Sequence, residues 1–172
     1  MRNILRNTLI LILLTANISC DQVSKNIVRE RMFPREEINI ISDYFKLIMV
    51  ENTGAFLSVG NNIPEPFKSI ILSFVPLLFL FLAAIYVFAN QGLSMSRVIA
   101  ITFVVGGGFG NIYDRIMLGS VTDFLHIDLG IVKTGIFNMA DVSIMVGMVM
   151  LLIESFMVRN KDVFEPQDSS DL

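Results

Sequence analysis

The chain has 172 residues, of which 53% are hydrophobic and only 17% are charged, and its formal net charge is -3. Soluble domains of this size carry about 25% charged residues, so the composition excludes an ordinary soluble enzyme and indicates a protein with several membrane spans. The small net charge gives no indication of a nucleic-acid partner, and we expect none.

Four apolar runs predict four membrane-spanning helices, at about residues 4–19, 69–89, 98–113 and 142–158. The second run has no charged residue and is long enough to cross about 30 Å of hydrocarbon. We therefore expect one membrane domain over residues 1–158, followed by a polar cytoplasmic tail at 159–172. An even number of spans places both chain ends on the same side of the membrane.

The distribution of Lys and Arg gives the expected orientation. The raw count is higher in the two predicted outer loops, residues 26–66 and 114–138, but the density is higher in the short inner segments. Arg2 and Arg6 flank the first span, which usually dominates the orientation. We therefore expect cytoplasmic termini and outer loops on the extracytoplasmic side.

The N-terminus also permits a different interpretation. Arg2 and Arg6, an apolar run and the segment ending in Cys20 resemble a lipoprotein signal peptide that would be cleaved before the cysteine. Asn17 fits poorly three positions before the cysteine, where an aliphatic residue is usual. The preferred hypothesis is an uncleaved first helix in which Cys20 is a small packing residue.

The outer loops contain strand-like patterns. Residues 39–45 and 46–50 alternate or run apolar, and residues 124–132 form a further strand-like stretch with a turn at Gly130. The residues expected to point inward in the first loop are Ile38, Ile40, Phe45, Leu47 and Met49. The predicted fold is thus an all-α membrane protein with four spans and a small extracytoplasmic antiparallel sheet.

Two aspartates, Asp123 and Asp141, stand where apolar runs give way to short polar segments. A carboxylate near a bilayer costs several kcal/mol, so both are candidates for function. Two carboxyls brought close together share one proton, so that one can activate water while the other polarises a carbonyl. The structural alternative is that Asp141 only caps the fourth helix.

Other polar residues accompany these acids. Asp21 and Lys25 are spaced i, i+4 and are expected to form an ion pair at the outer end of the first helix. Asn111 and Arg115 share a face in the same way, and nearby carboxylates would supply their partners. The Gly106–Gly108 run removes side chains from one turn, for which close helix packing is the default interpretation.

Cysteine and histidine each occur once, as Cys20 and His126. A single cysteine excludes an internal disulfide, and a lone histidine makes a zinc site improbable. We therefore expect no metal and no cofactor.

Five short blocks, in order and spacing, resemble the lipoprotein signal peptidase family (signal peptidase II), a family of aspartic peptidases. They are DQVSK at 21–25, ENTGAF at 51–56, GNIYDR at 110–115, VTDF at 121–124 and FNMAD at 137–141. The resemblance extends over residues 5–158, and five blocks on a four-span frame are far more specific than any one alone.

The resemblance implies an endopeptidase that removes the signal peptide from prolipoproteins by cutting before a diacylglyceryl-modified cysteine. It implies no metal, a sheet that forms a cradle over the site, and an active site at the outer face of the bacterial cytoplasmic (inner) membrane. The expected partners are these substrates and membrane lipids, and the expected form is a monomer. The implied residues are the catalytic pair Asp123 and Asp141, the residues that line or brace the site, Asn52, Gly54, Asn111, Arg115, Asn138 and Ala140, and the structural pair Asp21 and Lys25.

Two other classes of function use the same residues differently. A small proton-coupled transporter would use the aspartates as a proton relay and would need no lipidated peptide. A membrane scaffold would recruit partners through residues 26–66 and would tolerate charge-neutral substitutions at both aspartates.

Overall fold

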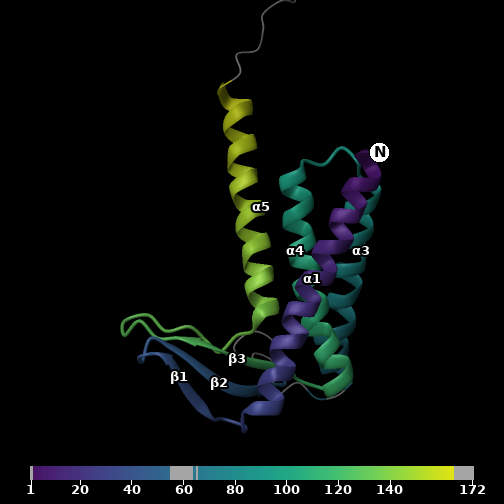
Figure 1. Ribbon diagram of the computed structural model, residues 1–172. Coiled ribbons are helices and arrows are strands. Elements are labelled where there is room, and N and C mark those ends of the chain that lie inside the picture. The colour runs from purple at the N-terminus through teal and green to yellow at the C-terminus, as the bar shows by residue number, and fades with distance from the viewer. Residues whose placement is uncertain (1, 55–63, 65, 165–172) are drawn as a thin grey trace, which may run out of the picture.

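The structure is a computed structural model that describes residues 2–54, 64 and 66–164. Its helices are α1 (Arg2–Arg31), the short α2 (Phe67–Ser69), the π-helical turn η2 (Ile70–Phe74), α3 (Val75–Ala89), α4 (Met95–Leu118) and α5 (Met139–Phe164). Four helical stretches are long and apolar enough to cross a membrane: Asn3–Arg31, Phe67–Ala89, Met95–Leu118 and Met139–Met157. The expected fold class is confirmed, with four helices side by side and a small sheet at one end (Figure 1).

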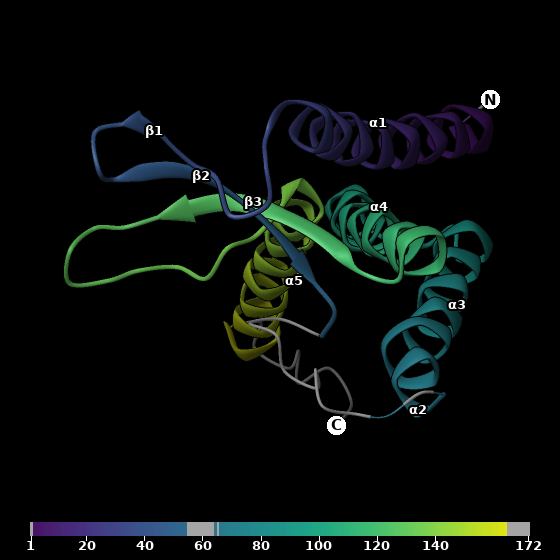
Figure 2. The ribbon, with the colours of Figure 1, turned by 90° about the horizontal axis from the view of Figure 1, so that it is seen from below.

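The sheet has the order β1-β2-β3 and is antiparallel throughout. Its strands are β1 (Glu37–Ile41), β2 (Phe45–Asn52) and β3 (Val121–Ile127). It extends sideways past α5 at the end where the first helix finishes (Figures 1 and 2). Pairing of β2 with β3 sets Asn52 opposite Val121 and Val50 opposite Asp123, and so brings the segment after α1 together with the segment after α4.

The predicted inward residues of the first outer loop are only partly right. Met49 is buried, and Phe45 and Leu47 pack against a core cluster formed by α1, β2 and β3. Ile38 and Ile40 are instead exposed, because β1 is an edge strand and no element of the described chain covers either of its faces.

The strand predicted at 124–132 is shifted in the structure. Pairing begins earlier, at Val121, and β3 ends at Ile127. There the Asp128 carboxylate accepts a hydrogen bond from the Gly130 amide at 2.9 Å. Gly130 adopts φ 80°, which glycine tolerates, so a turn is present at the predicted glycine. The turn formed by Asp128 and Gly130 therefore ends the strand at Ile127, although the apolar sequence pattern continues to Val132.

The first helix is longer than its apolar run, because polar side chains beyond Ser19 find partners inside the protein. Asp21 and Lys25 are fully buried although they lie in the part of α1 near the sheet. Cys20 is exposed, so the expectation that it is a small packing residue was wrong. At the other end of α1, Arg6 is buried and donates hydrogen bonds to the carbonyls of Val87 and Asn90. These carbonyls lie at the C-terminal end of α3, so the bonds join the two helices.

Helix α4 lies between the other three long helices (Figure 2), and its glycines make that position possible. An ideal Cβ on Gly106 would approach Asn17 of α1, one on Gly107 would lie 2.4 Å from the Ala140 carbonyl of α5, and one on Gly108 would meet Leu80 of α3. Consecutive glycines therefore face three different helices. The packing interpretation of this run explains all three positions.

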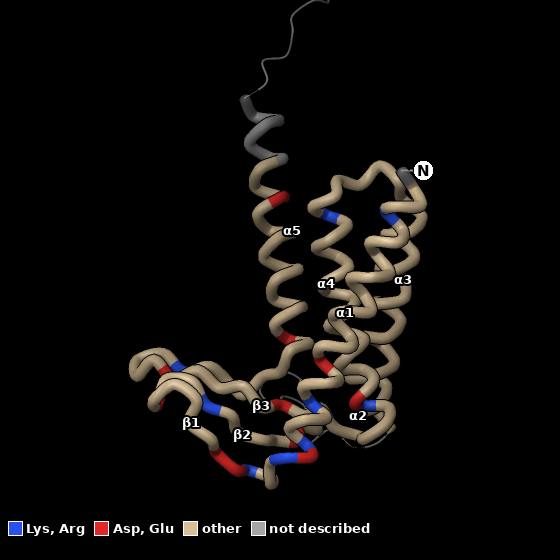
Figure 3. The backbone as a smooth tube through the Cα atoms, viewed as in Figure 1, with Lys and Arg blue, Asp and Glu red and all other residues tan. Residues whose placement is uncertain are grey.

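Among the residues described, the charged ones lie toward the two ends of the helical bundle and are absent from the middle of the spans (Figure 3). Most of them lie at the sheet end. At the opposite end, Arg97 approaches Glu154 at 3.5 Å and ties the start of α4 to α5. The sheet end is therefore the polar end at which a site for charged chemistry can form.

Replacing Gly107 with alanine is expected to destabilise the protein by about 1–3 kcal/mol, because the new methyl group forces α4 and α5 apart. Thermal unfolding in detergent measures the loss. Gly92→Ala is the matched control, since an ideal Cβ there meets nothing within 4 Å. Equal unfolding midpoints for the two variants would contradict the proposed close contact.

Candidate active site

Asp141 lies in the first turn of α5 and forms a reciprocal cap with Asn138, the residue before the helix. The Asn138 amide donates to Asp141 Oδ2 at 3.1 Å, and the Asp141 amide donates to Asn138 Oδ1 at 3.0 Å. This is the capping-box arrangement, which satisfies amides that have no partner within the helix. The structural alternative for Asp141 thus accounts for one carboxylate oxygen and leaves Oδ1 for other contacts.

Asp123 lies on β3, is only 4% exposed and is held by two asparagines. Asn138 Nδ2 donates to Asp123 Oδ1 at 2.6 Å, and Asn52 Nδ2 donates to Asp123 Oδ2 at 3.0 Å. Asn138 therefore contacts both acids, one through its side chain and one through its backbone. It connects the two polar blocks that the sequence places apart.

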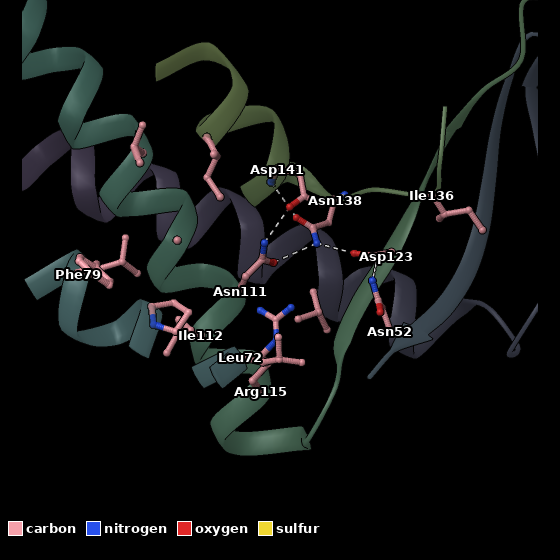
Figure 4. A pocket seen from close by; sticks show the side chains of 16 residues that line it. Asn52, Leu72, Phe79, Asn111, Ile112, Arg115, Asp123, Ile136, Asn138 and Asp141 are labelled. Atoms are coloured by element: carbon pink, nitrogen blue, oxygen red, sulfur yellow. Dashed lines mark hydrogen bonds between the residues drawn. The ribbon is translucent and has the colours of Figure 1, made fainter. Parts of the chain in front are cut away.

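Asn111 of α4 joins the same network from the opposite side (Figure 4). Its Nδ2 donates to Asp141 Oδ1 at 2.9 Å, while its Oδ1 accepts from Asn138 Nδ2 at 3.0 Å. The oxygen also accepts from Lys25 Nζ at 2.9 Å, which fixes which way the amide is turned. Both carboxyl groups are thereby oriented by amide side chains whose own orientations are determined.

Lys25 lies beneath this network as a fully buried cation between two buried carboxylates. Its Nζ is 2.8 Å from Asp21 Oδ2 and 3.1 Å from Asp114 Oδ2. The predicted i, i+4 pair is therefore present, and Asp114 of α4 adds a second acid. Burial of these charges is tolerated because each has close partners of opposite sign.

Each of the two buried carboxylates also holds the backbone of a site element. Asp21 Oδ1 accepts from the Ala140 amide at 2.9 Å, and Asp114 Oδ2 accepts from the Thr122 amide at 3.3 Å. Ala140 directly precedes Asp141, and Thr122 directly precedes Asp123. The ion cluster on α1 and α4 thus positions the chain immediately before each candidate acid.

Besides Asp114, four supporting residues were not among the expected site residues, namely Gln22, Arg29, Glu51 and Thr122. Gln22 Nε2 bridges Asp21 Oδ2, Asp114 Oδ1 and the Gly110 carbonyl at 3.0–3.1 Å. Arg29 donates to Thr122 Oγ1 at 2.9 Å, and the Thr122 hydroxyl lies 2.8 Å from Glu51 Oε1. Their positions were the available sequence signal. Gln22, Glu51 and Thr122 lie inside the motif blocks, and Arg29 lies one helical turn beyond the first block.

A cavity of about 350 Å³ contains both candidate acids. Its polar wall is formed by six of the expected site residues, namely Asn52, Asn111, Arg115, Asp123, Asn138 and Asp141. Its opposite wall is apolar, with Leu72, Pro76, Phe79 and Leu80 from the segment η2–α3. The cavity therefore combines a polar end beside the sheet with an apolar limb between α3 and α5.

The remaining expected site residues do not line this cavity. Gly54 donates its amide to Asn52 Oδ1 at 3.0 Å, and its carbonyl accepts from Arg115 Nη2 at 3.0 Å. Arg115 thus binds a backbone carbonyl instead of the carboxylate that the sequence suggested. Ala140 is fully buried against Gly107 and contributes its backbone only.

Burial raises the pKa of Asp123 to about 6 from its ordinary value of 3.8, and the nearby charge of Asp141 acts in the same direction. The hydrogen bonds from Asn52 and Asn138 oppose this rise. A carboxyl group titrating near neutral pH beside a second acid is suited to proton transfer. Among the described residues, no three His, Cys, Asp or Glu side chains gather as a metal-binding group.

Lys25→Met is expected to destabilise the protein by about 3–5 kcal/mol, because Asp21 and Asp114 would be left buried without a countercharge. The thermal unfolding midpoint in detergent measures this loss. Lys46→Met is the control, since the Lys46–Glu37 pair is solvated and its loss should change the midpoint far less. Restoration of stability by Asp114→Asn in the Lys25→Met background would identify the uncompensated carboxylates as the cause.

The raised pKa of Asp123 predicts a pH dependence of stability. The folded state binds the proton more tightly than the unfolded state, so this stabilisation is complete below about pH 4 and is lost as the pH rises through about 6. Relative to Asp123→Asn, the free energy of unfolding should fall by about 3 kcal/mol, since each pKa unit corresponds to about 1.4 kcal/mol. Parallel pH profiles for the two proteins would contradict the shift.

Comparison with known proteins identifies the same family that the five sequence blocks resemble. The family model for signal peptidase (SPase) II matches residues 12–157. The lipoprotein signal peptidase of Borrelia duttonii (strain Ly) is 33% identical over 171 residues, covering 92% of this chain and 97% of the relative. That of Syntrophus aciditrophicus (strain SB) is 30% identical over 152 residues, covering 87% and 94%.

The fold is also similar to solved structures. A bacterial membrane enzyme determined by the in meso method at 2.3 Å resolution matches with a TM-score of 0.79 and 20% identity, covering 94% of both chains. A second, at 1.9 Å resolution, matches with a TM-score of 0.76 and 23% identity, covering 86% of this chain and 92% of the other. The matched region and the coverage of the relatives show that this chain belongs to the signal peptidase II family of membrane peptidases.

Proposed function

We propose that this protein is an aspartic endopeptidase that cleaves diacylglyceryl-modified prolipoproteins immediately before the lipidated cysteine. The observation that carries the proposal is the shared cavity, in which Asp123 and Asp141 lie at the polar end of an apolar limb. Family membership supports the lipoprotein substrate. Cleavage of a peptide that carries acyl chains needs acids beside its peptide bond and apolar space for its chains, and this cavity offers both.

In the proposed reaction, the two acids share one proton. Burial favours the proton on Asp123, whose pKa is raised to about 6. The Asp141 carboxylate takes a proton from water while the oxygen of that water attacks the carbonyl carbon, and Asp123 gives its proton to the carbonyl oxygen. The proton held by Asp141 then passes to the leaving nitrogen, the C–N bond breaks, and Asp123 recovers its proton from the intermediate's hydroxyl.

Asn111, Asn138 and Asn52 would keep the acids in register during these transfers. Each asparagine donates a hydrogen bond from its side-chain amide to a carboxyl oxygen. Each therefore fixes the orientation of that carboxyl group without giving up a proton. Arg115, held to Gly54, places a cation at the cavity wall. It would attract the developing negative charge on the substrate's carbonyl oxygen.

We propose that the sheet end faces the outside of the bacterial cytoplasmic membrane and that both termini are cytoplasmic. Arg6 and Arg97 at the opposite end of the bundle support this orientation. Substrate would then reach the cavity along the membrane plane, with its acyl chains among lipids. The proposed working form is a monomer with lipid around the helices.

The alternative of a proton-coupled transporter uses the same acids. It is not favoured, since the chain belongs to a peptidase family. Both acids and their hydrogen-bond partners also lie at the sheet end of the bundle, whereas Ile10, Val87 and Val98 form an apolar core toward the other end. A scaffold function would leave the paired acids without a role.

Asp123→Asn and Asp141→Asn are each expected to reduce cleavage by about 10²–10⁴-fold, because each removes a proton donor or acceptor. Asparagine keeps the shape of each side chain and one of its two acceptor oxygens, so both variants should insert and fold, and their thermal unfolding midpoints check this. The assay incubates purified protein with a diacylglyceryl-modified peptide and detects a new N-terminal cysteine by mass spectrometry. Asp43→Asn is the control, because Asp43 is 85% exposed and lies outside the cavity.

Cleavage at wild-type rate in either asparagine variant would refute the paired-acid mechanism. Absence of cleavage by the wild-type protein, together with proton or solute flux in proteoliposomes, would support the transporter instead.

A further inference from the structure

A second hollow, of about 270 Å³, lies on the other side of the first turns of α5. It is formed between α5 and the segment that follows β3, which lie side by side at the sheet end (Figures 1 and 2). Its lining residues are Thr134, Gly135, Phe137, Asp141, Val142, Met145 and Val146. Apart from Thr134 and Asp141 these residues carry no polar side chain, so the hollow is suited to hydrocarbon.

Asp141 belongs to both hollows, so they meet at the candidate catalytic acid. Along α5, Asp141 and Ile144 line the catalytic cavity, whereas Val142 and Met145 line the second hollow. These two pairs lie on neighbouring helix faces about 100° apart. Both hollows therefore start at Asp141 and follow α5 away from the sheet, into the membrane-spanning part.

The wall between the hollows is thin. Ile136 lines the catalytic cavity, while its neighbours Gly135 and Phe137 line the second hollow. Such alternation is expected of an extended segment, whose successive side chains point to opposite sides. Helix α5 and this segment together separate two apolar spaces that share one polar end.

We propose that the second hollow holds one of the two acyl chains of the substrate, so that the diacylglyceryl group straddles α5. This inference rests on the proposed function and adds where the two chains lie. Two chains attached to one glycerol must diverge from a single point, and the two hollows diverge from Asp141. The exposure of Met145, at 63%, leaves the second hollow open for a chain to enter from the bilayer.

Binding of uncleavable lipopeptides tests this inference. Two peptides with a reduced scissile bond are compared, one with two long acyl chains and one in which the second chain is replaced by an acetyl group. Their inhibition constants are measured against cleavage of a diacyl substrate by the wild-type protein in lipid nanodiscs. We expect the second long chain to strengthen inhibition at least tenfold.

Met145→Trp is expected to fill the hollow and to reduce this advantage to less than threefold. Leu152→Trp is the matched control, because Leu152 lies on the same face of α5, is 55% exposed and is two turns beyond the hollow. It should retain the advantage. An advantage that is absent in the wild type, or unchanged in Met145→Trp, would overturn the inference and would leave the hollow to bilayer lipid.

A measurement on the unmodified protein removes any dependence on how the variant folds. A diazirine near the carboxyl end of either acyl chain of the uncleavable peptide is activated by light, and the labelled residues are mapped by mass spectrometry. We expect one chain to label residues 142–146 and the other to label residues 72–80. Labelling of only the second range by both probes would overturn the inference, whereas failure of the proposed function would appear separately, as absence of cleavage.

Discussion

The geometry of the site depends on the ion pairs that the buried Lys25 ammonium group forms with two carboxylates. The ammonium joins Asp21 on its own helix to Asp114 on α4, and these two carboxylates bind the amides of Ala140 and Thr122. One cation thus controls the approach of α5 and β3, the two elements that carry the acids. Such a cluster adds little net stability, but in this protein any other arrangement of α1 and α4 would leave Asp21, Lys25 or Asp114 buried without a partner of opposite charge.

Close approach of the helices is the second requirement, and it comes from the absence of side chains. Gly107 allows the backbone at Ala140 to reach α4, and Gly110 leaves room for the Asp21 carboxylate, which would otherwise lie 2.5 Å from a Cβ. Without these contacts the carboxylate could not reach the start of α5. Packing and electrostatics therefore act on the same few residues, and neither alone would bring the acids into one cavity.

Much of this structure could be predicted from the sequence. Apolar runs predicted the four spans, and the compact polar blocks predicted residues that the structure brings together around one cavity, because polar groups near a bilayer need partners. The end of β3 could not be predicted, since the turn at Asp128–Gly130 competes with an apolar pattern that continues to Val132. The exposure of Ile38 and Ile40 depends on which strand is at the edge, and alternation along one strand carries no information about its neighbours.

The contribution of Asp114 and Gln22 was equally hidden, because it depends on which helix faces align. Asp114 stands beside Arg115 in sequence, yet its ion-pair partner is Lys25 on another helix. Helical spacing predicts contacts within one helix, whereas contacts between helices require the crossing positions that the glycines determine. The capping and catalytic roles of Asp141 were treated as alternatives for a similar reason, since the sequence does not show that one carboxyl oxygen accepts from the Asn138 amide and the other from Asn111.

The reciprocal cap between Asn138 and Asp141 has a consequence for how α5 moves. Helix ends ordinarily unwind first, because their amides have only water as a partner. At this end three amides, those of Asn138, Ala140 and Asp141, are bound by side chains of the protein. Fraying of α5 from this end is thereby opposed, and the carboxyl group of Asp141, a candidate catalytic acid, is attached to a turn whose amides are held by the protein.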